Sequence, residues 1–579
     1  MLAVWTLLAI GLPWLGALCL LVVGDCHRRR LNFLASLFAV LAGMATLAAL
    51  PLASGKTLSL FSLGGVFGEF TLLADGLSLS IAAIATVVGS AAVIFAIDYM
   101  KHAEQLARFY ALMLFFIGAM VGLAVSGSLL IAFLFWEITA FCSYALISFH
   151  NDDPRAVAGG IQALIMTQVG GVGLLVGALL VYAYFGNYQV SSLLQGSRSL
   201  PPGALGFIAF GFLVAAAAKS AQVPFHAWLP DAMEAPTPVT ALIHAATMVN
   251  AGVYLLARFY PAFEEVPGWR LAVMAVGVLS ALVAGLLALT AGDIKRVLAY
   301  STISQLGYMV YAVGTGSIFA AQFHLFSHAI FKALLFLSAG AVITLLGTRD
   351  LVRMGGLRRL MPFIYMSFGI GSLGLAGLPI ANGFFSKELV LEGGLEGGPF
   401  AFYLLMLLGA GITALYTIRL FWMVFHGERR GPEPSHDGLP FMSISLGILS
   451  IATLTTWLAA GNLSRLLANT LPYHRLEPES TWTIVRQVTL APATWIALAV
   501  IALGFGAWFI RARIAPWVRS LKPLAAHGFG LESLPPRIAT WTDRLAASLQ
   551  VTQTGQLNWN VAGIPLGVIL VLLILIRYR

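Results

Sequence analysis

Residues 211–230, GFLVAAAAKSAQVPFHAWLP, decide the fold, because they place a lysine at the end of a long apolar run. Lys219 lies a few residues before Pro224. A cationic side chain at the centre of a membrane helix costs roughly 2.5–3.5 kcal/mol on insertion scales. Glu137, in LLIAFLFWEITAFCSYALI, and Lys332, in HLFSHAIFKALLFLSAG, are similar anomalies. Ionisable groups spaced through an otherwise apolar chain predict a path for protons or cations.

The composition is that of a membrane protein. Of the 579 residues, 59% are hydrophobic and only 10% are charged, whereas about 25% are charged in soluble proteins. The mean hydropathy is +0.89. Residues 1–24 lack a basic start and a small-residue cleavage site, so we expect a retained first span rather than a signal peptide. These features predict an all-α polytopic membrane protein.

Apolar stretches long enough to cross a bilayer as helices, about 20 residues each, recur along the chain. We expect about sixteen transmembrane helices. Their predicted ranges are 2–23, 31–51, 76–99, 108–126, 129–149, 156–185, 204–225, 237–258, 271–291, 296–315, 320–346, 361–380, 399–426, 440–460, 489–511 and 559–577. Residues 52–74 alternate in polarity and are rich in glycine, which predicts a small external hairpin.

The net charge of +9 does not indicate a nucleic-acid partner, because the basic residues gather in loops separated by even numbers of spans. Such loops share one side of the membrane, and the positive-inside rule makes that side cytoplasmic. Both termini are then expected on the outer side. The residues concerned are Arg28, Arg29, Arg30, Lys101, Arg108, Lys295, Arg296, Arg349, Arg353, Arg358, Arg359, Arg429, Arg430, Arg511, Arg513, Arg519 and Lys522.

The three cysteines, Cys19, Cys26 and Cys142, form no C-x-x-C pair. Iron–sulfur clusters and structural zinc sites usually need four closely organised ligands. We therefore expect no redox cofactor and no metal in this chain.

Two expected spans are interrupted by proline. The first passes Lys219 and meets Pro224, and the second, FGIGSLGLAGLPIANGFFSKELV, carries Pro379 and Asn382 before Lys387. Breaks of this kind are tolerated where protein or water lines them. Two lysine-bearing broken helices in comparable positions predict an internal repeat, which in transporters is often inverted with the ion site near the midplane.

Glu137 and Lys219 together suggest a switch. A desolvated carboxylate gains proton affinity, and a nearby ammonium reduces that affinity again. Paired, both groups stay charged; separated, lysine tends to release a proton and glutamate to take one up. The alternative is a static salt bridge between helices, but the further buried charges favour conduction.

His324, His328 and Lys332 follow one another at intervals of four, so they share one helix face. We interpret them as a proton relay, because imidazole titrates near neutrality. A metal site and a purely structural role are the alternatives, although no glutamate or cysteine completes a ligand set. His244, in VTALIHAATMVNAG, is expected to link the two halves, or else to be an ordinary interior histidine.

Two loops adjoin these spans. HAWLPDAMEAPTPVTAL contains three prolines that stiffen a re-entrant turn, for which a static elbow is the favoured role. GDIKRVLAYSTISQLGYM opens with Asp293, which is expected to cap a helix and to face Lys295 and Arg296.

Several of these stretches resemble one family. The chain resembles the antiporter-like, proton-pumping subunits of respiratory complex I, together with Mrp-type antiporter and membrane-bound hydrogenase subunits, over nearly its whole length. The stretches concerned are FWEITAFCSYALI, KSAQVPFHAWLPDAMEAPTPVTALIHAATMVNAGVYLLARF, DIKRVLAYSTISQLGYM, HLFSHAIFKALLFLSAG, MGGLRRLMP and GFFSKE.

The resemblance implies two inverted five-helix repeats around a hydrated axis, with N-terminal helices over 1–99, repeats over 100–260 and 261–426, and C-terminal helices over 427–579. It implies that Glu137 and Lys219 are the coupled pair of the first half. It further implies a connecting relay and a terminal lysine, and Asp293 and Lys295 match further positions of the family. The relay residues are His324, His328 and Lys332, and the terminal lysine is Lys387.

Within the family, the L-type subunit, called chain 5 in mitochondria, is the most similar. Asn250 favours that type, because the Mrp A-type and complex I M-type chains usually have lysine there. Gly171 departs from the type, which commonly has aspartate. The stretch over 512–557 is too short for the long lateral helix of L-type chains, although residues 537–550 could form a short amphipathic surface helix.

The leading hypothesis is therefore a proton-translocating subunit of a complex I-like NADH–quinone oxidoreductase in a bacterial cell membrane. Such a chain holds no cofactor itself and contributes no redox chemistry; its partners are other membrane subunits and the lipid bilayer. The alternatives are an Mrp-type Na⁺/H⁺ antiporter subunit, an ion-translocating subunit of a hydrogenase or inorganic-carbon uptake complex, and a structural scaffold.

Overall fold

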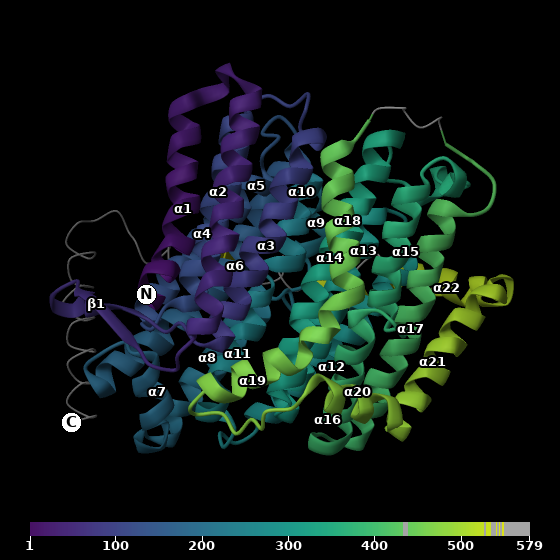
Figure 1. The fold of residues 1–579 in the computed structure, drawn as a ribbon. Helices are drawn as coiled ribbons and strands as arrows, with labels where there is room; N and C mark the ends of the chain where they lie inside the picture. Colours follow the sequence, from purple (N-terminus) through teal and green to yellow (C-terminus); the bar gives the residue numbers. More distant parts are fainter. Residues whose placement is uncertain (432–437, 526–527, 534–539, 541–542, 545–546, 549–579) are drawn as a thin grey trace. The chain divides into compact units, whose positions relative to one another are not determined.

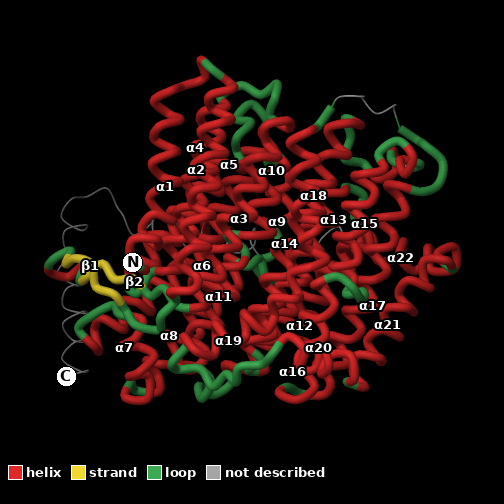
Figure 2. Tube along the Cα trace, viewed as in Figure 1, coloured by secondary structure: helices red, strands yellow, loops and turns green. Residues whose placement is uncertain are grey.

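The computed structural model describes all residues except 432–437, 526–527, 534–539, 541–542, 545–546 and 549–579 (Figure 1). The described chain is built almost wholly of helices, with one two-stranded hairpin (Figure 2). The helices are α1 (Leu2–Val23), α2 (Arg28–Ala49), α3 (Gly76–Tyr99), α4 (Leu106–Val125), α5 (Leu129–Ile147), α6 (Pro154–Phe185), α7 (Val190–Gly196), α8 (Pro202–Lys219), α9 (Trp228–Asp231), α10 (Thr237–Ala241), α11 (Asn250–Phe263), α12 (Trp269–Thr290), α13 (Ile294–Thr315), α14 (Ile318–Leu346), α15 (Pro362–Ala376), α16 (Asn382–Gly397), α17 (Phe400–Phe425), α18 (Pro440–Thr455), α19 (Ala460–Thr470), α20 (Thr481–Leu490), α21 (Pro492–Phe509) and α22 (Arg511–Ala525).

Thirteen helices of the described residues are long and apolar enough to cross a membrane. This confirms the all-α membrane class, but it does not establish the expected count of sixteen. Of the three remaining ranges, α13 is a full-length helix of lower hydropathy and α15 is a shorter apolar helix. The third, 559–577, lies outside the described residues.

The predicted hairpin is present. Strands β1 (Leu58–Ser62) and β2 (Glu69–Leu72) pair antiparallel, with a register irregularity between Ser59 and Phe61. Phe61 and Phe70 stack across the pair with ring centroids 5.1 Å apart. A two-stranded hairpin is marginal alone, so its apolar contacts with the helices matter.

Both expected breaks occur. Helix α8 ends at Lys219 rather than continuing to 225 as expected, because the chain leaves the helical conformation at Ala221, where φ is 49°. The second break separates α15 from α16 over 377–381, where Gly377 and Ile380 both have positive φ. An unpredicted irregularity precedes α11: Leu242–Ala246 form a π-helix that ends at the non-helical Thr247. Such π-turns are frequent at functional sites.

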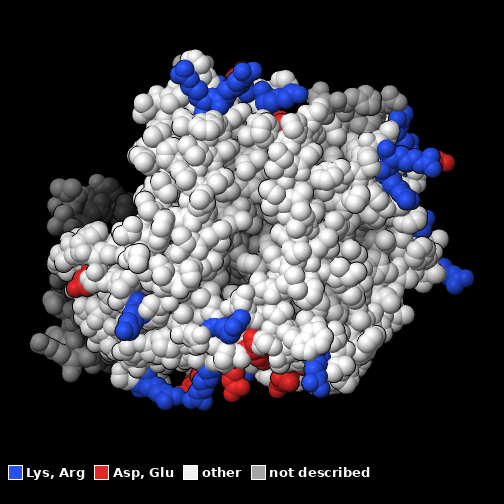
Figure 3. All heavy atoms as spheres, viewed as in Figure 1, with Lys and Arg blue, Asp and Glu red and all other residues white. Residues whose placement is uncertain are grey.

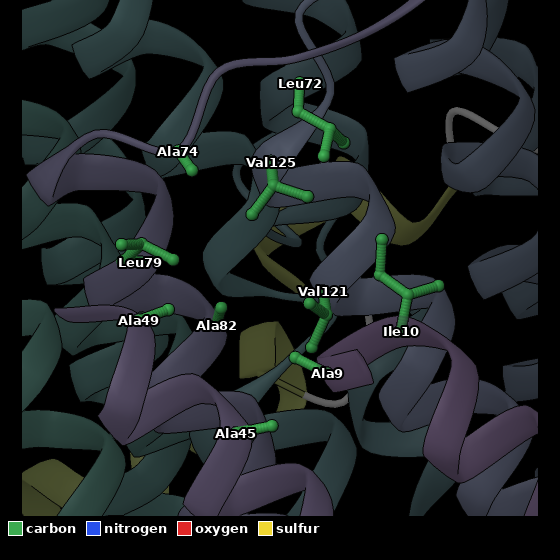
Figure 4. Packing of buried hydrophobic residues seen from close by; sticks show 10 residues of the cluster. All are labelled: Ala9, Ile10, Ala45, Ala49, Leu72, Ala74, Leu79, Ala82, Val121 and Val125. Atoms are coloured by element: carbon green, nitrogen blue, oxygen red, sulfur yellow. The ribbon is translucent and has the colours of Figure 1, made fainter. Parts of the chain in front are cut away.

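Small side chains allow the N-terminal helices to approach closely. A cluster of buried residues joins α1, α2, α3 and α4 to the second strand of the hairpin (Figure 4). Its members are Ala9, Ile10, Ala45, Ala49, Leu72, Ala74, Leu79, Ala82, Val121 and Val125. Because lipid tails are as apolar as these side chains, close van der Waals packing rather than the hydrophobic effect holds such helices together.

The basic loops meet at one end of the helices. Arg28 donates to the carbonyls of Met100, Lys101 and Ala103, which joins the α1–α2 loop to the α3–α4 loop. Asp98 accepts a hydrogen bond from the first turn of α18 at 2.9 Å. In Figure 3, lysines and arginines dominate the end where the α1–α2 loop lies, whereas the opposite end carries both signs.

The opposite end contains a buried ion pair. Arg258 of α11 binds both carboxylate oxygens of Asp75 and also donates to the Ser78 hydroxyl at 2.8 Å. Asp75 caps α3 as well, accepting from the Ser78 backbone N–H at 2.9 Å. The His474 ring nitrogen Nε2 donates to the Ala257 carbonyl at 2.8 Å, which anchors the loop after α19 to the same place.

Residues Met1–Lys522 form one compact unit and Pro523–Arg579 a second. Helix α22 carries the basic residues Arg511 and Arg513 in its first turn. The predicted amphipathic segment over 537–550 lies largely outside the described residues. The division of the chain at 99, 260 and 426, and the inverted relation of the two halves, stay predictions.

Candidate functional site

All seven residues predicted from the sequence lie on helices or at helix breaks. Six are completely buried, and Glu137 on α5 is partly buried. Lys219 closes α8, His244 lies in the π-helix, and Lys387 is in the second turn of α16. The remaining three, His324, His328 and Lys332, share α14. Because a polar side chain in apolar surroundings is costly unless it is hydrogen-bonded, the hydrogen-bond partners of these residues determine how readily each one carries a charge.

Lys219 and Glu137 lie close together without forming an ion pair. The Lys219 ammonium donates to the main-chain carbonyl of Trp136 at 2.8 Å and lies 4.9 Å from the centre of the Trp136 ring. Neither carboxylate oxygen of Glu137 has a hydrogen-bond partner among the described residues. The structure therefore shows the two groups separated, which in the switch hypothesis is the arrangement that favours proton exchange.

Gly171 of α6 provides the space for the Glu137 carboxylate. A Cβ atom at Gly171 would lie 2.5 Å from Glu137 Oε1. The departure from aspartate at this position therefore removes one acidic group and also lets the remaining carboxylate lie directly against the α6 backbone.

His244 lies between aromatic rings of the two halves. Its ring centroid is 5.5 Å from Phe336 on α14 and 6.5 Å from Trp228 on α9. Both of its ring nitrogens lack hydrogen-bond partners in the part of the chain that the structure describes. Asn250 is the first residue of α11. Its side-chain amide donates to the Ala245 carbonyl at 2.9 Å, which satisfies a carbonyl near the end of the π-helix that carries His244.

The α14 residues connect to α13 and α16. Lys332 donates to the Leu298 carbonyl at 3.0 Å and to the Ser301 hydroxyl. The His324 ring bonds Ser386 Oγ at 3.0 Å and Gln305 Oε1 at 3.2 Å. His328 lies between Lys332 and His324 on α14, with its ring centroid 6.5 Å from that of His324. Neither of its ring nitrogens has a hydrogen-bond partner among the residues described.

Lys387 has a neighbour that the sequence reasoning missed. Its Nζ has no hydrogen-bond partner among the described residues and lies 5.1 Å from the centre of the Tyr308 ring. Glu388, adjacent in the chain, is 2% exposed, and its Oε1 is also unpartnered. The signal was present in GFFSKE, but a Lys–Glu pair at a helix start ordinarily faces water. The burial of His226 was also not predicted, because the sequence HAWLP was interpreted as part of a static, proline-stiffened turn.

Unpartnered polar atoms recur from the first half to the second. Buried polar groups without a protein partner are usually bonded to water. We therefore expect water molecules among these side chains, which together with the imidazoles would connect the lysines. The atoms concerned include Glu137 Oε1 and Oε2, both ring nitrogens of His226, His244 and His328, Gln305 Nε2, Asn382 Oδ1, Lys387 Nζ and Glu388 Oε1.

The proline-rich elbow is held by charged groups at the basic end. Arg349 binds both oxygens of Glu234 at 3.0 Å, and its Nε lies 3.1 Å from Asp293. Burial alone would lower the pKa of Arg349, but the hydrogen bonds to Glu234 and the charge of Asp293 outweigh it and raise the pKa. Asp293 caps α13 as predicted, accepting from the Lys295 and Arg296 backbones.

Lys295 faces the elbow from inside. Its side chain is buried and donates to the Ala235 carbonyl at 2.6 Å. Arg296, on the next position, instead points to Asp231 at 3.0 Å on the surface. Within the described part of the chain, no group of three or more histidine, cysteine, aspartate or glutamate side chains is placed to hold a metal ion.

Comparison with known proteins identifies the family. Residues 126–413 match the membrane domain described as "NADH:quinone oxidoreductase/Mrp antiporter, TM". Residues 61–110 match the N-terminus of complex I chain 5. NADH-quinone oxidoreductase subunit L of Escherichia coli is 36% identical over 537 residues, which cover 88% of each chain. The chain belongs to the NADH:quinone oxidoreductase/Mrp antiporter family.

Both branches of this family are represented among its relatives. NAD(P)H-quinone oxidoreductase chain 5 of Synechocystis is 41% identical over 65% of this chain, which covers 58% of that protein. Na⁺/H⁺ antiporter subunit A1 of Staphylococcus haemolyticus is 37% identical over 69% of this chain. This family member spans only about half, 53%, of the antiporter subunit.

A solved structure agrees with the fold. A chain of the Mrp complex from Dietzia superposes with a TM-score of 0.84 and 27% identity; the match covers all of this family member and 63% of that chain. An archaeal membrane-bound sulfane sulfur reductase gives a TM-score of 0.72 at 23% identity, which shows the shared fold alone.

Proposed function

We propose that this chain is the L-type, proton-translocating membrane subunit of a complex I-like NADH–quinone oxidoreductase. The observation that carries the proposal is the series of three completely buried lysines, Lys219, Lys332 and Lys387, none of which forms an ion pair among the described residues. A static scaffold would be expected to pair such groups, because an unpaired buried charge is costly. A lysine that alternates between its charged and neutral forms does not need a permanent partner of opposite charge.

The first half would act as the switch. When the Lys219 ammonium turns from the Trp136 carbonyl toward Glu137, both groups favour their charged forms. When it returns to the carbonyl, the carboxylate favours its protonated form and the lysine favours the neutral amine. Each cycle therefore moves a proton through this pair, provided that the partner subunits drive the motion.

The second half would carry the proton onward. His244 provides an imidazole between the halves, and His324 and His328 continue the series toward Lys387. Neutral imidazole can accept a proton on one nitrogen and release one from the other. No electron transfer is assigned to this chain; flavin and iron–sulfur subunits among its partners would supply the redox energy.

The orientation follows from the charges. The end at which the basic loops meet is assigned to the cytoplasm by the positive-inside rule. The hairpin and the N-terminus then lie on the outer side of a bacterial cell membrane.

A second candidate is an Mrp-type Na⁺/H⁺ antiporter subunit, supported by the similarity to antiporter subunit A1 and to a chain of the Mrp complex. A sodium site requires converging oxygen ligands. The candidate pathway instead presents ammonium and imidazole nitrogens, which favours protons over sodium as the ion in this chain.

Purification of the tagged chain from its native membrane tests the assignment. Recovery with peripheral NADH-oxidising subunits, flavin and iron would support the redox pump. Recovery with small membrane subunits alone, and sodium-dependent proton exchange in vesicles, would replace it with the antiporter.

Two substitutions test the ion path. Glu137→Gln and Lys219→Ala are expected to assemble normally and to abolish proton pumping. Matched controls are Glu265→Gln and Lys56→Ala, which change exposed side chains of the same types and should leave pumping intact. Unchanged pumping in both site variants would support a scaffold.

A further inference from the structure

Two helix breaks, each partway along a line of two helices, meet inside the protein. One is the break at 377–381 before α16, and the other is a 3₁₀ turn, Thr456–Ala459, between α18 and α19. The Asn382 amide donates to Thr456 Oγ1 at 2.9 Å and so joins the two breaks. A 3₁₀ stretch inside a long helix often marks a hinge or a functional site.

A cavity of about 300 Å³ adjoins this hydrogen bond. Thr456 forms part of its wall, together with residues of α3, α14 and α19. Leu50 and Pro51, which follow the end of α2 remote from Arg28, also line it, so the cavity lies near the hairpin end of the protein. Its wall is apolar apart from three residues that can bond water, Ser80, Thr456 and Asn462.

On the inner side of Asn382, polar groups lead directly to the histidines. The Ser386 hydroxyl, one turn further along α16, donates to the Asn382 main-chain carbonyl at 3.1 Å and bonds His324 at 3.0 Å. Asn382 is completely buried, and its Oδ1 has no partner among the described residues. The Ser327 hydroxyl is likewise buried and has no hydrogen-bond partner within the described ranges. Unpartnered oxygens at this depth indicate sites for water.

We propose that protons leave this chain through the cavity beside Thr456, and that the Asn382 side chain is the barrier between the cavity and His324. This inference rests on the proposed proton-translocating function. A proton would break from the ring nitrogen of protonated His324 and form a bond to water. Neutral His324 would then be reprotonated from the Lys332 side of α14.

Asn382 is suited to be a barrier because an amide hydrogen-bonds water without readily accepting a proton. While it donates to Thr456, its polar end bridges the two breaks, and in the proposed exit it interrupts the line of water between them. Rotation of the amide toward the Ser327 carbonyl, to which it already donates a weaker hydrogen bond at 3.4 Å, would open the path.

Cysteine labelling tests whether the cavity is hydrated and connected. Cys19, Cys26 and Cys142 are first replaced by alanine, and the intact complex is placed in oriented vesicles. A charged, membrane-impermeant thiosulfonate added to the outer side is expected to modify Thr456→Cys and to lower proton pumping severalfold. The matched control is Thr455→Cys, an adjacent exposed position whose hydroxyl donates to the Ile451 carbonyl of its own helix. We expect slow modification there, because a lipid-facing thiol meets little water and forms little thiolate.

Substitutions at Asn382 test the barrier. Asn382→Leu, which is similar in size and apolar, is expected to slow pumping while assembly is retained. Asn382→Ala removes the barrier and is expected to let protons leak back, so that NADH oxidation continues with a smaller proton gradient. A purely structural hydrogen bond predicts lower assembly in both variants and no leak.

The outcomes separate the exit from the function. No labelling of Thr456→Cys in a complex that pumps would overturn the exit while leaving the proposed function intact. Labelling that does not change pumping would also overturn it. Labelling of Thr456→Cys in a complex that moves no protons, whichever electron donor is supplied, would overturn the proposed function and the proton exit with it.

Discussion

The Lys219 ammonium is hydrogen-bonded to the carbonyl of Trp136, one residue before the carboxylate it was expected to pair with. The lysine comes from the end of α8 and the carbonyl from the middle of α5. A small change in the lysine side chain would therefore be enough to exchange a neutral acceptor for a charged one. In the proposed switch, the proton affinity of this pair would depend on that exchange rather than on a large movement of helices.

Gly171→Ala should impair pumping, because its Cβ would lie 2.5 Å from Glu137 Oε1 and the carboxylate would have to move. Displacement of a reacting group by about 1 Å can cost up to roughly 10²-fold in rate, so we expect a loss of about tenfold or more in proton pumping by reconstituted complex. Gly206→Ala is the control: it is the same change in helix α8, where an added Cβ meets nothing within 4 Å. Equal pumping by the two variants would contradict the assigned role of Gly171.

Ser301→Ala should slow proton transfer through Lys332, because it removes the hydroxyl that accepts from the lysine. A hydrogen bond to a charged group contributes about 1.5–3 kcal/mol, so the charged form of Lys332 would become markedly less populated. Ser304→Ala is the matched control on the same helix, since that hydroxyl bonds the Ala281 carbonyl instead. Pumping rates measured across a pH series would show a shifted profile for Ser301→Ala and an unshifted profile for Ser304→Ala. An unshifted profile in both would remove Lys332 from the path.

Arg258→Met should destabilise the protein strongly, because it leaves the Asp75 carboxylate buried without its cation. Breaking one side of a buried ion pair costs about 3–5 kcal/mol, so we expect a clear fall in the thermal unfolding midpoint in detergent. Combining it with Asp75→Asn, which removes the orphaned charge, should recover part of that loss.

The exposed pair Arg198–Glu265 is the control for this comparison. Its side chains are 76% and 68% exposed, with the charged atoms 2.7 Å apart. Exposed pairs contribute about 0–1 kcal/mol, so Arg198→Met should leave the unfolding midpoint almost unchanged. Similar shifts for Arg258→Met and Arg198→Met would show that Asp75 gains other partners.

Acid should loosen the loop after α19. The pKa of His474 is lowered from 6.5 to about 4, chiefly by burial and also by the charge of Arg258, while the hydrogen bond to the Ala257 carbonyl and the charge of Asp75 act in the opposite direction. The released loop then binds more protons than the docked loop below pH 6.5, so docking weakens progressively between pH 6.5 and about 4. Hydrogen exchange of residues 471–480 should therefore be faster at pH 5 than at pH 7.5, after correction for intrinsic rates.

His474→Gln should abolish this pH dependence, because the amide can still donate to the Ala257 carbonyl but does not titrate in this range. His102→Gln, in a loop at the basic end, should leave it unaltered. Retention of the pH dependence in His474→Gln would assign the effect to the Asp75–Arg258 pair instead.

Much of the fold followed from local composition. Apolar runs predicted the spans because each helix in a bilayer must satisfy its own backbone hydrogen bonds and present apolar side chains to lipid. Prolines marked the breaks after Lys219 and before Asn382, and aspartate before Ile294 marked a helix cap. The burial of His324 and Lys332 could be predicted for the same reason, since a polar side chain within a long apolar helix has no route to water along its own helix. Lys219 and Lys387 were predicted to be buried because the apolar runs around them continued past the breaks.

The contacts of these buried side chains could not be predicted from the sequence, because the contacting atoms belong to helices that are remote in the chain. That Lys219 bonds a main-chain carbonyl, that Gly171 makes room for Glu137, and that Glu388 is buried beside Lys387 depend on how helices pack. The π-helix at His244 and the Asn382–Thr456 bond have no local sequence signal of their own. The sequence by itself determined which groups are taken out of water. Only the tertiary structure decided which of them meet, because a hydrogen bond requires atoms within about 3 Å and only packing sets distances between helices so finely.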